Sequence, residues 1–478
     1  MQSGTRSKKK ASRNAHQTTP TTVPGTSDPA KEIPSTPDWV RQALQGKEFP
    51  LLSTPSSSLS SKDQFLLQHY FYTVANLLSS THDRSVNTYR MVILPMAMSS
   101  EMLLNALLLV STTHLSSRYE HVALDLPKYR QRVLPSLINR INSWQRFEAT
   151  TLATIIMLSI NEVFEANADT WSRHLKAAGR IIADYTSQCT KPDQDVKMLL
   201  DIFAYHNVLA SVGTDHTSLV MDYYYISETW SAFTGKNFAF LSCVDRLLSL
   251  VAKLSVLSSS ACLECPAISS FSLDENPAGI NLPSSPLPCA CHHTSKRKPH
   301  RTISATHLPS ALALKTDLEQ WEPPVAGVSD DARNTAEAMR SAGLLFYHQL
   351  TSQYRSTRDV ASIASACRSV INHIDVVPAD SPAAASHLWP LYMAGCFLLP
   401  SRSSTDVSWD DGSQDLQGVD SDTLSLRDSI RRRLTALKAK RGIRTVDRVA
   451  ERLDKIWSRN VGDVEASWNE LTDPLILI

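Results

Sequence analysis

The residues of this chain best suited to chemistry are thiols and imidazoles in its middle. They are Cys262, Cys265, Cys289, Cys291, His292 and His293. In structural zinc sites, four such side chains coordinate the zinc ion tetrahedrally, and they commonly come from two CxxC-like pairs. Here the second pair is CxC, and the segment that joins the pairs is rich in proline and serine. A zinc site and a reduced, disordered insertion both fit the pattern, and we expect the insertion, with no bound metal.

An aspartate cluster offers the second chemistry. Asp410, Asp411 and Asp415, in DDGSQD, imitate the motif by which helical terpenoid synthases hold magnesium and diphosphate. That chemistry needs a rigid helix, which Gly412 and Ser413 disfavour, and no second magnesium motif accompanies the first. We expect no catalytic residue and no cofactor. The surrounding acidic, apolar-interleaved run fits a disordered activation segment or a solvated loop.

Basic residues cluster near the start of the chain, in SGTRSKKKASRN. They are Arg6, Lys8, Lys9, Lys10 and Arg13. Because the net charge of the whole chain is only +1, attraction to nucleic acid would be local. The cluster predicts a nuclear-targeting signal or non-specific contacts with DNA phosphates, and a solvated tail is the alternative.

The composition excludes several classes of protein. The 14 glycines never lie closer than six positions apart, so GxGxxG, Walker and GxSxG signatures are absent. The apolar windows are too short or too polar to cross a membrane, and no signal peptide is evident. We therefore expect an intracellular, soluble protein with reduced thiols, and buried positions for Cys189, Cys243, Cys367 and Cys396.

Helical periodicity fills most of the chain from residue 61. SKDQ predicts a capping box with Ser61 as N-cap and Gln64 three residues later. Residues 134–141 form an apolar stripe, and residues 152–164 are apolar nearly all round and should be central. Residues 171–185 place Leu175, Ala178, Ile181 and Ile182 on one face and basic residues on the other. The fold class expected is all-α, an irregular multi-helix array with a disordered N-terminal tail and two disordered insertions.

Composition shifts divide the chain into six parts. They are a disordered basic and Ser/Thr/Pro-rich tail, 1–60; the first helical part, 61–256; a disordered Cys/Pro/Ser-rich insertion, 257–310; the second helical part, 311–400; an acidic insertion, 401–425; and basic C-terminal helices, 426–478. Residues 427–459 hold twelve basic and four acidic residues. This arginine-rich helix fits a solvated face, an intramolecular partner for the acidic insertion or, as the third alternative, a DNA-binding element.

Several side chains in the helices are assigned to packing. His69, His114, His174 and His206 lie on predicted helices at no mutual ligand spacing, so each is expected in the core or at its boundary. Trp389 and Tyr392, in HLWPLY, are expected to pack, with a ligand pocket between helices as the alternative.

Several blocks of the sequence, in order, resemble the fungal-specific transcription factor domain, the regulatory region of fungal zinc-cluster transcription factors. The blocks are FLLQHYFYTVANLLS, ILPMAMSSEMLLNALLLVSTTHLSSR, WSRHLKAAGRII, LEQWEPP, HLWPLYMAGC and VDRVAERLDKIWSRN, followed by SWNEL. The resemblance implies a transcription regulator that acts in the nucleus. That family reads DNA through an N-terminal cluster of six cysteines and two zinc ions. The first cysteine here is Cys189, so those ligands cannot be carried over.

The sequence therefore predicts a regulator, not an enzyme, that works through its helical domain and lacks its own zinc-cluster module. Its expected partners are transcriptional proteins, with a small-molecule effector and a homodimer left open, DNA contacted at most non-specifically through the tail, and no membrane. A cytosolic helical scaffold is one alternative. Another is a gene that encodes a longer protein, with a zinc cluster upstream of Met1.

Overall fold

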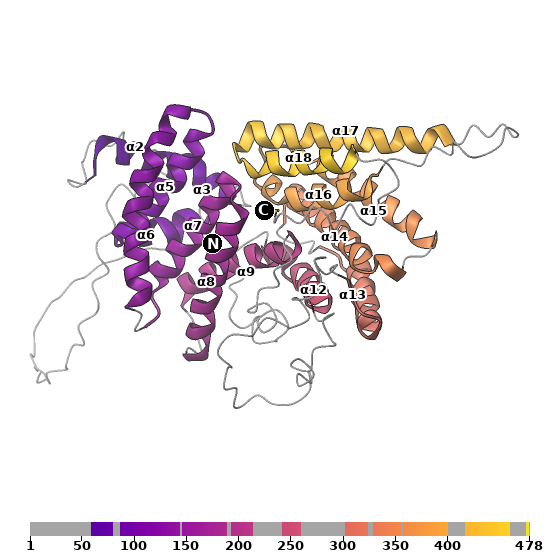
Figure 1. Cartoon of the computed structure of the whole chain (residues 1–478), viewed down its shortest axis with the longest axis horizontal. Coiled ribbons are helices and arrows are strands. Elements are labelled where there is room, and N and C mark those ends of the chain that lie inside the picture. The colour runs from indigo at the N-terminus through magenta and orange to yellow at the C-terminus, as the bar shows by residue number, and fades with distance from the viewer. Residues whose placement is uncertain are drawn as a thin grey trace, which may run out of the picture. The chain divides into compact units, whose positions relative to one another are not determined.

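The computed structural model describes ten stretches of the chain. They are residues 59–79, 87–143, 146–188, 193–213, 241–259, 302–323, 328–354, 357–399, 416–458 and 475–477. Every regular element in these stretches is a helix, and no strand occurs in them, which confirms the all-α prediction (Figure 1).

The helices up to residue 213 follow one another with short connections. They are α2 (Ser61–His69), the π turn η1 (Tyr70–Val74), α3 (Ala75–Leu78), the π turn η3 (Tyr89–Ile93), α4 (Leu94–Met98), α5 (Glu101–Ser116), the 3-10 helix η4 (Glu120–Asp125), α6 (Leu126–Asn142), α7 (Ala149–Glu165), α8 (Ala168–Gln188) and α9 (Gln194–Gly213).

The helices after residue 240 complete the fold. They are α12 (Leu241–Ser259), η6 (Ala305–His307), α13 (Leu308–Gln320), α14 (Asp330–Leu350), η7 (Ser352–Tyr354), α15 (Thr357–Asp375), η8 (Pro382–Ser386), α16 (Leu388–Phe397), α17 (Leu416–Arg441) and α18 (Thr445–Trp457). Three of these, η6, η7 and η8, are short 3-10 helices.

The first helix begins where predicted, but its cap is shifted by one residue. Ser60 is the N-cap: its backbone is extended, and its Oγ accepts a hydrogen bond from the Asp63 amide at 3.1 Å. Gln64 reaches back to the Leu59 carbonyl oxygen at 3.1 Å. The assignment of Ser61 as N-cap was therefore wrong, because Ser61 already lies inside the helix. At α5, Ser100 is the N-cap, and its Oγ accepts a hydrogen bond from the Leu103 amide.

Helix α7 is the centre of the N-terminal helices, as its all-round apolar sequence predicted. Every residue from Thr151 to Phe164 is buried. Helices α5, α6, α8, α9 and α18 all pack against it. Helix α8 is amphipathic as expected, with Leu175, Ala178 and Ile182 buried and Arg173 exposed.

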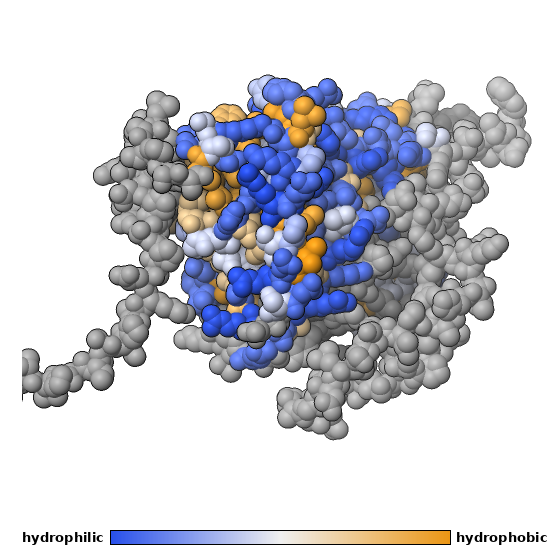
Figure 2. All heavy atoms as spheres, turned by 60° about the vertical axis from the view of Figure 1, so that its left-hand side comes forward, coloured by the Kyte–Doolittle hydropathy of each residue, from blue (hydrophilic) through white to orange (hydrophobic). Residues whose placement is uncertain are grey.

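The apolar stripe of α6 faces two ways. Val133 and Leu137 are buried, whereas Leu134, Ile138 and Ile141 are exposed. The view in Figure 2 shows a surface on which hydrophilic residues predominate and hydrophobic ones form small groups. The sequence periodicity therefore predicted a wider apolar stripe on α6 than the part of the helix that is buried in the core.

The C-terminal helices pack around α14 and α16, and α18 approaches α16 closely. A Cβ atom added to Gly395 of α16 would lie 2.7 Å from Cδ2 of Leu453 on α18, which is closer than carbon atoms pack. Trp457, at the end of α18, donates its indole N–H to the Gly395 carbonyl oxygen at 2.8 Å. The absence of a side chain at Gly395 thus allows the two helices to meet.

The helix limits also define the ends of the two predicted insertions. Helix α12 continues to Ser259, α13 begins at Leu308 and α17 begins at Leu416. Parts of the margins of the insertions predicted at 257–310 and 401–425 are therefore helical, because these three helices extend further than the composition suggested. Residues 260–301 and 400–415, like most of the predicted 1–60 tail, lie outside the described residues.

Candidate regulatory site

Three arginines of the basic helix α17 point into the protein. Arg427, Arg433 and Arg441 expose only 7, 8 and 6% of their surface. Arg431, Arg432, Lys438 and Lys440 of the same helix are exposed, in keeping with a solvated outer face. On its inner face the arginine-rich helix thus contacts other helices of the domain. Its pairing with the acidic insertion, one of the three alternatives open from its sequence, stays a prediction, because residues 400–415 lie outside the described residues.

Arg427 binds the end of α16. Its Nε and Nη2 atoms both donate to the Leu398 carbonyl oxygen, at 2.8 and 2.6 Å, and its guanidinium lies 5.4 Å from the Trp457 ring centre. The last carbonyl groups of a helix have no partner within it and carry the negative end of the helix dipole. A cation at this position satisfies both the hydrogen bonds and the dipole.

Arg433 makes an equivalent contact beyond the end of α15. Nη1 donates to the Val377 carbonyl oxygen at 2.7 Å, and Nη2 donates to His387 Nδ1 at 2.8 Å. Because Nδ1 of His387 is the acceptor, its Nε2–H must donate to Thr335 Oγ1, 2.9 Å away. Burial lowers the pKa of His387 well below its usual value, so this imidazole is neutral at pH 7.

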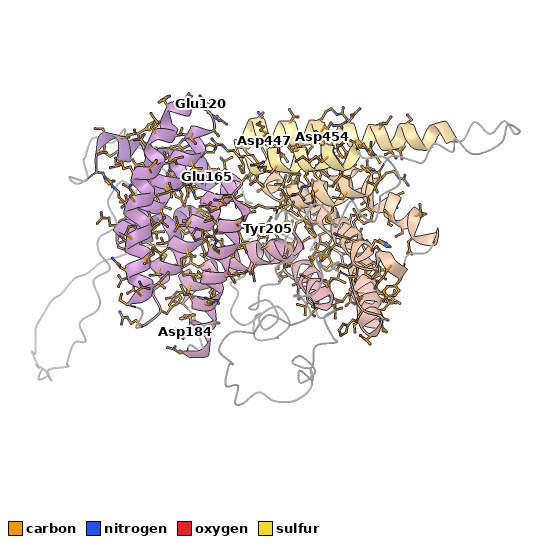
Figure 3. The ribbon with its side chains drawn as sticks, in the orientation of Figure 1. Glu120, Glu165, Asp184, Tyr205, Asp447 and Asp454 are labelled. Carbon is orange, nitrogen blue, oxygen red and sulfur yellow. The ribbon has the colours of Figure 1, made fainter. Side chains whose placement is uncertain are left out.

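Exposed ion pairs also join α17 to α18, in addition to the contacts of the three buried arginines. Lys438 lies 2.6 Å from Asp447, and Arg431 lies 3.0 Å from Asp454. Figure 3 shows both aspartates on α18 beside α17. Such pairs on the surface contribute little free energy individually, so the buried arginines carry more of the attachment of α17.

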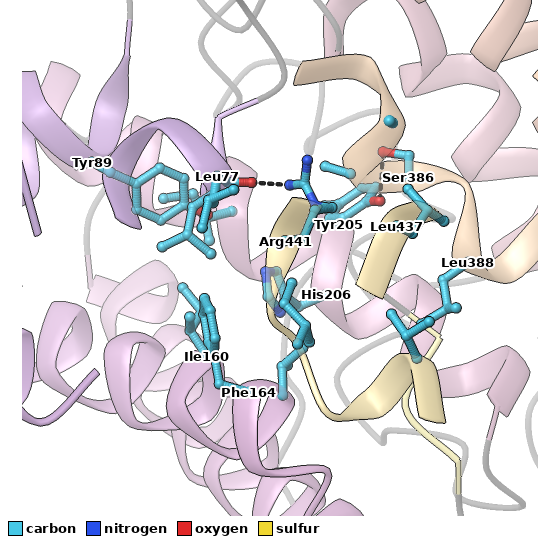
Figure 4. A pocket seen from close by; sticks show the side chains of 17 residues that line it. Leu77, Tyr89, Ile160, Phe164, Tyr205, His206, Ser386, Leu388, Leu437 and Arg441 are labelled. Atoms are coloured by element: carbon cyan, nitrogen blue, oxygen red, sulfur yellow. Dashed lines mark hydrogen bonds between the residues drawn. The ribbon is translucent and has the colours of Figure 1, made fainter. Parts of the chain in front are cut away.

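Arg441 differs from the other two, because it lines a cavity. The volume of this cavity is about 70 Å³. Its wall comes from α3, η3, α7 and α9 and from η8, α16, α17 and α18 (Figure 4). The residues that line it are Leu77, Leu78, Tyr89, Ile160, Val163, Phe164, Ile202, Tyr205, His206, Ala384, Ala385, Ser386, Leu388, Leu437, Arg441, Ile443 and Val446.

The polar groups of this wall are few. Arg441 Nη2 donates to the Leu77 carbonyl oxygen, and the Tyr205 hydroxyl donates to Ser386 Oγ at 2.8 Å. Nδ1 of His206 is buried without a hydrogen-bond partner among the described residues. Burial lowers the pKa of His206 to about 4 and that of Arg441 to about 10, so at pH 7 the wall carries a neutral imidazole and one cation.

Two histidines from different helices join the Arg441 end of α17. His69 Nε2 lies 2.8 Å from His114 Nδ1, and His114 Nε2 lies 3.1 Å from the Arg441 carbonyl oxygen. Because a carbonyl oxygen can only accept, His114 Nε2 carries the proton and His69 Nε2 donates to His114 Nδ1. Burial lowers the pKa of both imidazoles to about 4. The histidine pair therefore caps α17 in its neutral form.

The end of α17 also depends on a glycine. Gly442 has a φ of 63°, and its amide donates to the Lys438 carbonyl oxygen at 2.9 Å, an arrangement that favours glycine after a helix. A Cβ atom there would lie 2.9 Å from Ser117 Oγ and 3.3 Å from His114 Nε2.

Sequence reasoning placed these histidines correctly in the core or at its boundary, but it did not pair His69 with His114. The contact joins residues 45 positions apart on two helices, for which the local sequence carries no signal. Trp389 is fully buried and packs as expected; its neighbour Leu388, and not Trp389, lines the cavity. Cys367 and Cys396 are buried free thiols, as predicted.

Other sequence-predicted sites cannot be placed. The basic residues Arg6, Lys8, Lys9, Lys10 and Arg13, the cysteine and histidine cluster from Cys262 to His293, and the aspartates of DDGSQD lie outside the described residues, as does Cys189. Within the described stretches, no group of three or more metal-ligating side chains comes together. No described helix is both long enough and apolar enough to cross a membrane.

Comparison with protein families decides the relationship of this chain. The family described as fungal specific transcription factor domain matches residues 65–475. The chain belongs to this family. The match spans both groups of helices and every wall of the cavity, so the cavity lies inside the family domain. No curated protein and no solved structure matched the chain.

Membership confirms the family resemblance of the sequence blocks. It points to transcription regulation, because the family is a regulatory domain of transcription factors and not a family of enzymes. Within this fungal transcription factor domain, the buried arginines of α17 hold the last helices against the rest, and the cavity at Arg441 is a candidate site for a ligand.

Proposed function

We propose that this protein is a nuclear transcription regulator of the fungal zinc-cluster type that acts through its helical domain. The observation that carries the proposal is the family match over residues 65–475. The domain binds transcriptional partner proteins, and a small effector held between its helices controls that binding. The cavity at Arg441 supports the effector, since its wall is mainly apolar with a few convergent polar groups.

DNA contact, in this proposal, is limited to phosphates. Five positive charges in the stretch from Arg6 to Arg13 give a salt dependence of at most about 4.5 in the logarithmic slope, and they offer no scaffold for reading base edges. The buried orientation of Arg427, Arg433 and Arg441 supports the same conclusion for α17, because these guanidinium groups are engaged inside the protein.

Localisation separates this function from that of a cytosolic scaffold. A fluorescently tagged chain should accumulate in the nucleus, and changing Lys8, Lys9 and Lys10 together to alanine should abolish that accumulation. A matched control changes Lys176, Lys440 and Lys455, three exposed lysines on helices, together to alanine and should leave the distribution unchanged. Exclusion of the unaltered chain from the nucleus would favour the scaffold.

Competition binding tests the absence of base reading. The purified chain should bind random and genomic duplexes with similar affinity. Discrimination of about a thousandfold or more for one site would contradict the proposal, because phosphate contacts alone do not provide it.

A further inference from the structure

The cavity at Arg441 has an unusual combination of burial and charge. Arg441 exposes only 6% of its surface, yet in the described part of the chain its guanidinium has one hydrogen-bond acceptor, the Leu77 carbonyl oxygen, and no carboxylate partner. A buried cation without an anion is costly, and buried charges are ordinarily paired. The structure therefore leaves Arg441 with donor capacity directed at a cavity.

The other two buried arginines of α17 differ from Arg441 in their hydrogen bonds and in their distance from the cavity. Arg433 donates to the Val377 carbonyl oxygen and to His387 Nδ1, and Arg427 donates twice to the Leu398 carbonyl oxygen and lies against Trp457. Neither of these two lines the cavity. On the same helix and at similar burial, Arg441 is the arginine whose guanidinium makes the fewest hydrogen bonds to described residues, and it has open space beside it.

The remaining polar groups of the wall can also donate. The Ser386 hydroxyl accepts from Tyr205, which leaves its own proton to be donated. No hydrogen bond of the Tyr89 hydroxyl occurs among the described residues, and Tyr89 lines the cavity. The His206 imidazole is buried with Nδ1 unpartnered. Figure 4 shows Arg441, Tyr205 and Ser386 on one side of the cavity and Ile160 and Phe164 on another.

Among the described residues, no aspartate or glutamate lines the cavity, and most of its wall is leucine, isoleucine, valine, alanine and phenylalanine. The ligand that fits has a negative group for Arg441 and a hydrocarbon part for the apolar wall. The volume of the cavity also limits the size of the ligand. A cavity of about 150 Å³ encloses benzene, so about 70 Å³ encloses roughly three or four non-hydrogen atoms, which is the size of acetate.

We propose that the cavity binds a short-chain organic carboxylate, with the carboxylate on the Arg441 guanidinium and the hydrocarbon chain against Ile160, Phe164 and Leu437. The ligand would contact α7, which lies in the N-terminal group of helices, and α17 together. Its binding therefore strengthens the attachment of α17 and α18. This inference rests on the proposed function only in calling the ligand an effector, since binding itself is a property of the purified chain.

Acetate and its neutral isostere acetamide are suitable probes. Isothermal titration of the purified full chain, at constant ionic strength adjusted with sodium chloride, should show saturable binding of acetate at least about tenfold tighter than that of acetamide, because a charge-assisted pair is worth about that much. Arg441→Met should remove the preference for the anion. Lys440→Met, which removes an exposed cation from the preceding position, should bind acetate as the unaltered chain does.

Further variants keep the test decisive if Arg441→Met fails to fold. Ala384→Leu fills the cavity and leaves Arg441 in place, so it should weaken both probes. Arg441→Lys keeps the charge and should retain a preference for acetate. Equal affinity of acetate and acetamide for the unaltered chain, or acetate binding that Ala384→Leu leaves unchanged, would overturn the proposal. Neither result would affect the localisation or the transcriptional role, which are measured separately in cells.

Discussion

The inward-facing arginines of α17 can be tested with two neighbouring residues of the same RRR run. Arg433 is 8% exposed and donates to the Val377 carbonyl oxygen and to His387 Nδ1, whereas Arg432 is exposed and contacts Ser429 of its own helix. Arg433→Met keeps much of the side-chain volume but leaves those two acceptors without a donor. Arg432→Met removes the same charge without disturbing a buried contact.

The magnitude follows from the lost donors. A buried acceptor left unsatisfied costs about 1–3 kcal/mol, so two of them cost about 2–6 kcal/mol. Removing the guanidinium also removes its own desolvation cost, and we expect a net loss of about 2–4 kcal/mol in the free energy of unfolding. For Arg432→Met the expected change is within about 0.5 kcal/mol, as for most surface substitutions.

Urea-induced unfolding followed by circular dichroism at 222 nm measures both variants against the unaltered chain. The slope of the transition must be the same for all three for the comparison to hold. Equal stability of Arg433→Met and Arg432→Met would contradict this prediction, because it would mean that the buried hydrogen bonds of Arg433 do not stabilise the attachment of α17.

Three further predictions concern glycine and histidine. Gly395→Ala should lower the free energy of unfolding by about 1–3 kcal/mol, measured by urea unfolding, because the new methyl group overlaps Leu453. Gly442→Ala should lower the free energy of unfolding by a similar amount, about 1–3 kcal/mol, because alanine disfavours the positive φ and its Cβ atom would lie too close to Ser117 Oγ. Unchanged stability of this variant would contradict the helix end assigned to Gly442. The pKa of His114 falls from 6.5 to about 4 on folding, so the unfolded chain binds the proton more readily and stability should decline as pH falls from about 6.5 to 4. His114→Gln keeps a donor for α17 and should reduce this decline by roughly 1–3 kcal/mol in pH-dependent unfolding, whereas an unchanged pH profile would count against the buried pair.

Features that repeat along one helix were accessible from the sequence. Helix α7 is apolar all round and is central, and α8 buries Leu175 and Ile182 and exposes Arg173, because the side-chain period of a helix fixes which residues share a face. The end of a helix is less well determined. Ser60 and Ser61 can both cap α2, and only the position of the Asp63 amide selects Ser60.

Contacts between distant segments could not be predicted in this way. The bond from Arg441 to the Leu77 carbonyl joins residues 364 positions apart, and the sequence of α17 does not show which of its arginines face inward. Which arginines of α17 are buried depends on where the ends of α15 and α16 lie beside this helix, and therefore on the packing of the whole domain. The cavity, for the same reason, belongs to no single block: its walls come from eight helical elements.

We infer that the helical domain itself regulates transcription. A reporter assay measures this directly: the full chain, fused to an unrelated DNA-binding domain, is recruited upstream of a reporter gene in a fungal cell and compared with the same fusion carrying Arg433→Met. We expect a reproducible change in reporter output with the unaltered chain and a smaller change with the variant, at equal nuclear abundance. Reporter output equal to that of the DNA-binding domain alone, with the fusion folded and present in the nucleus, would contradict it.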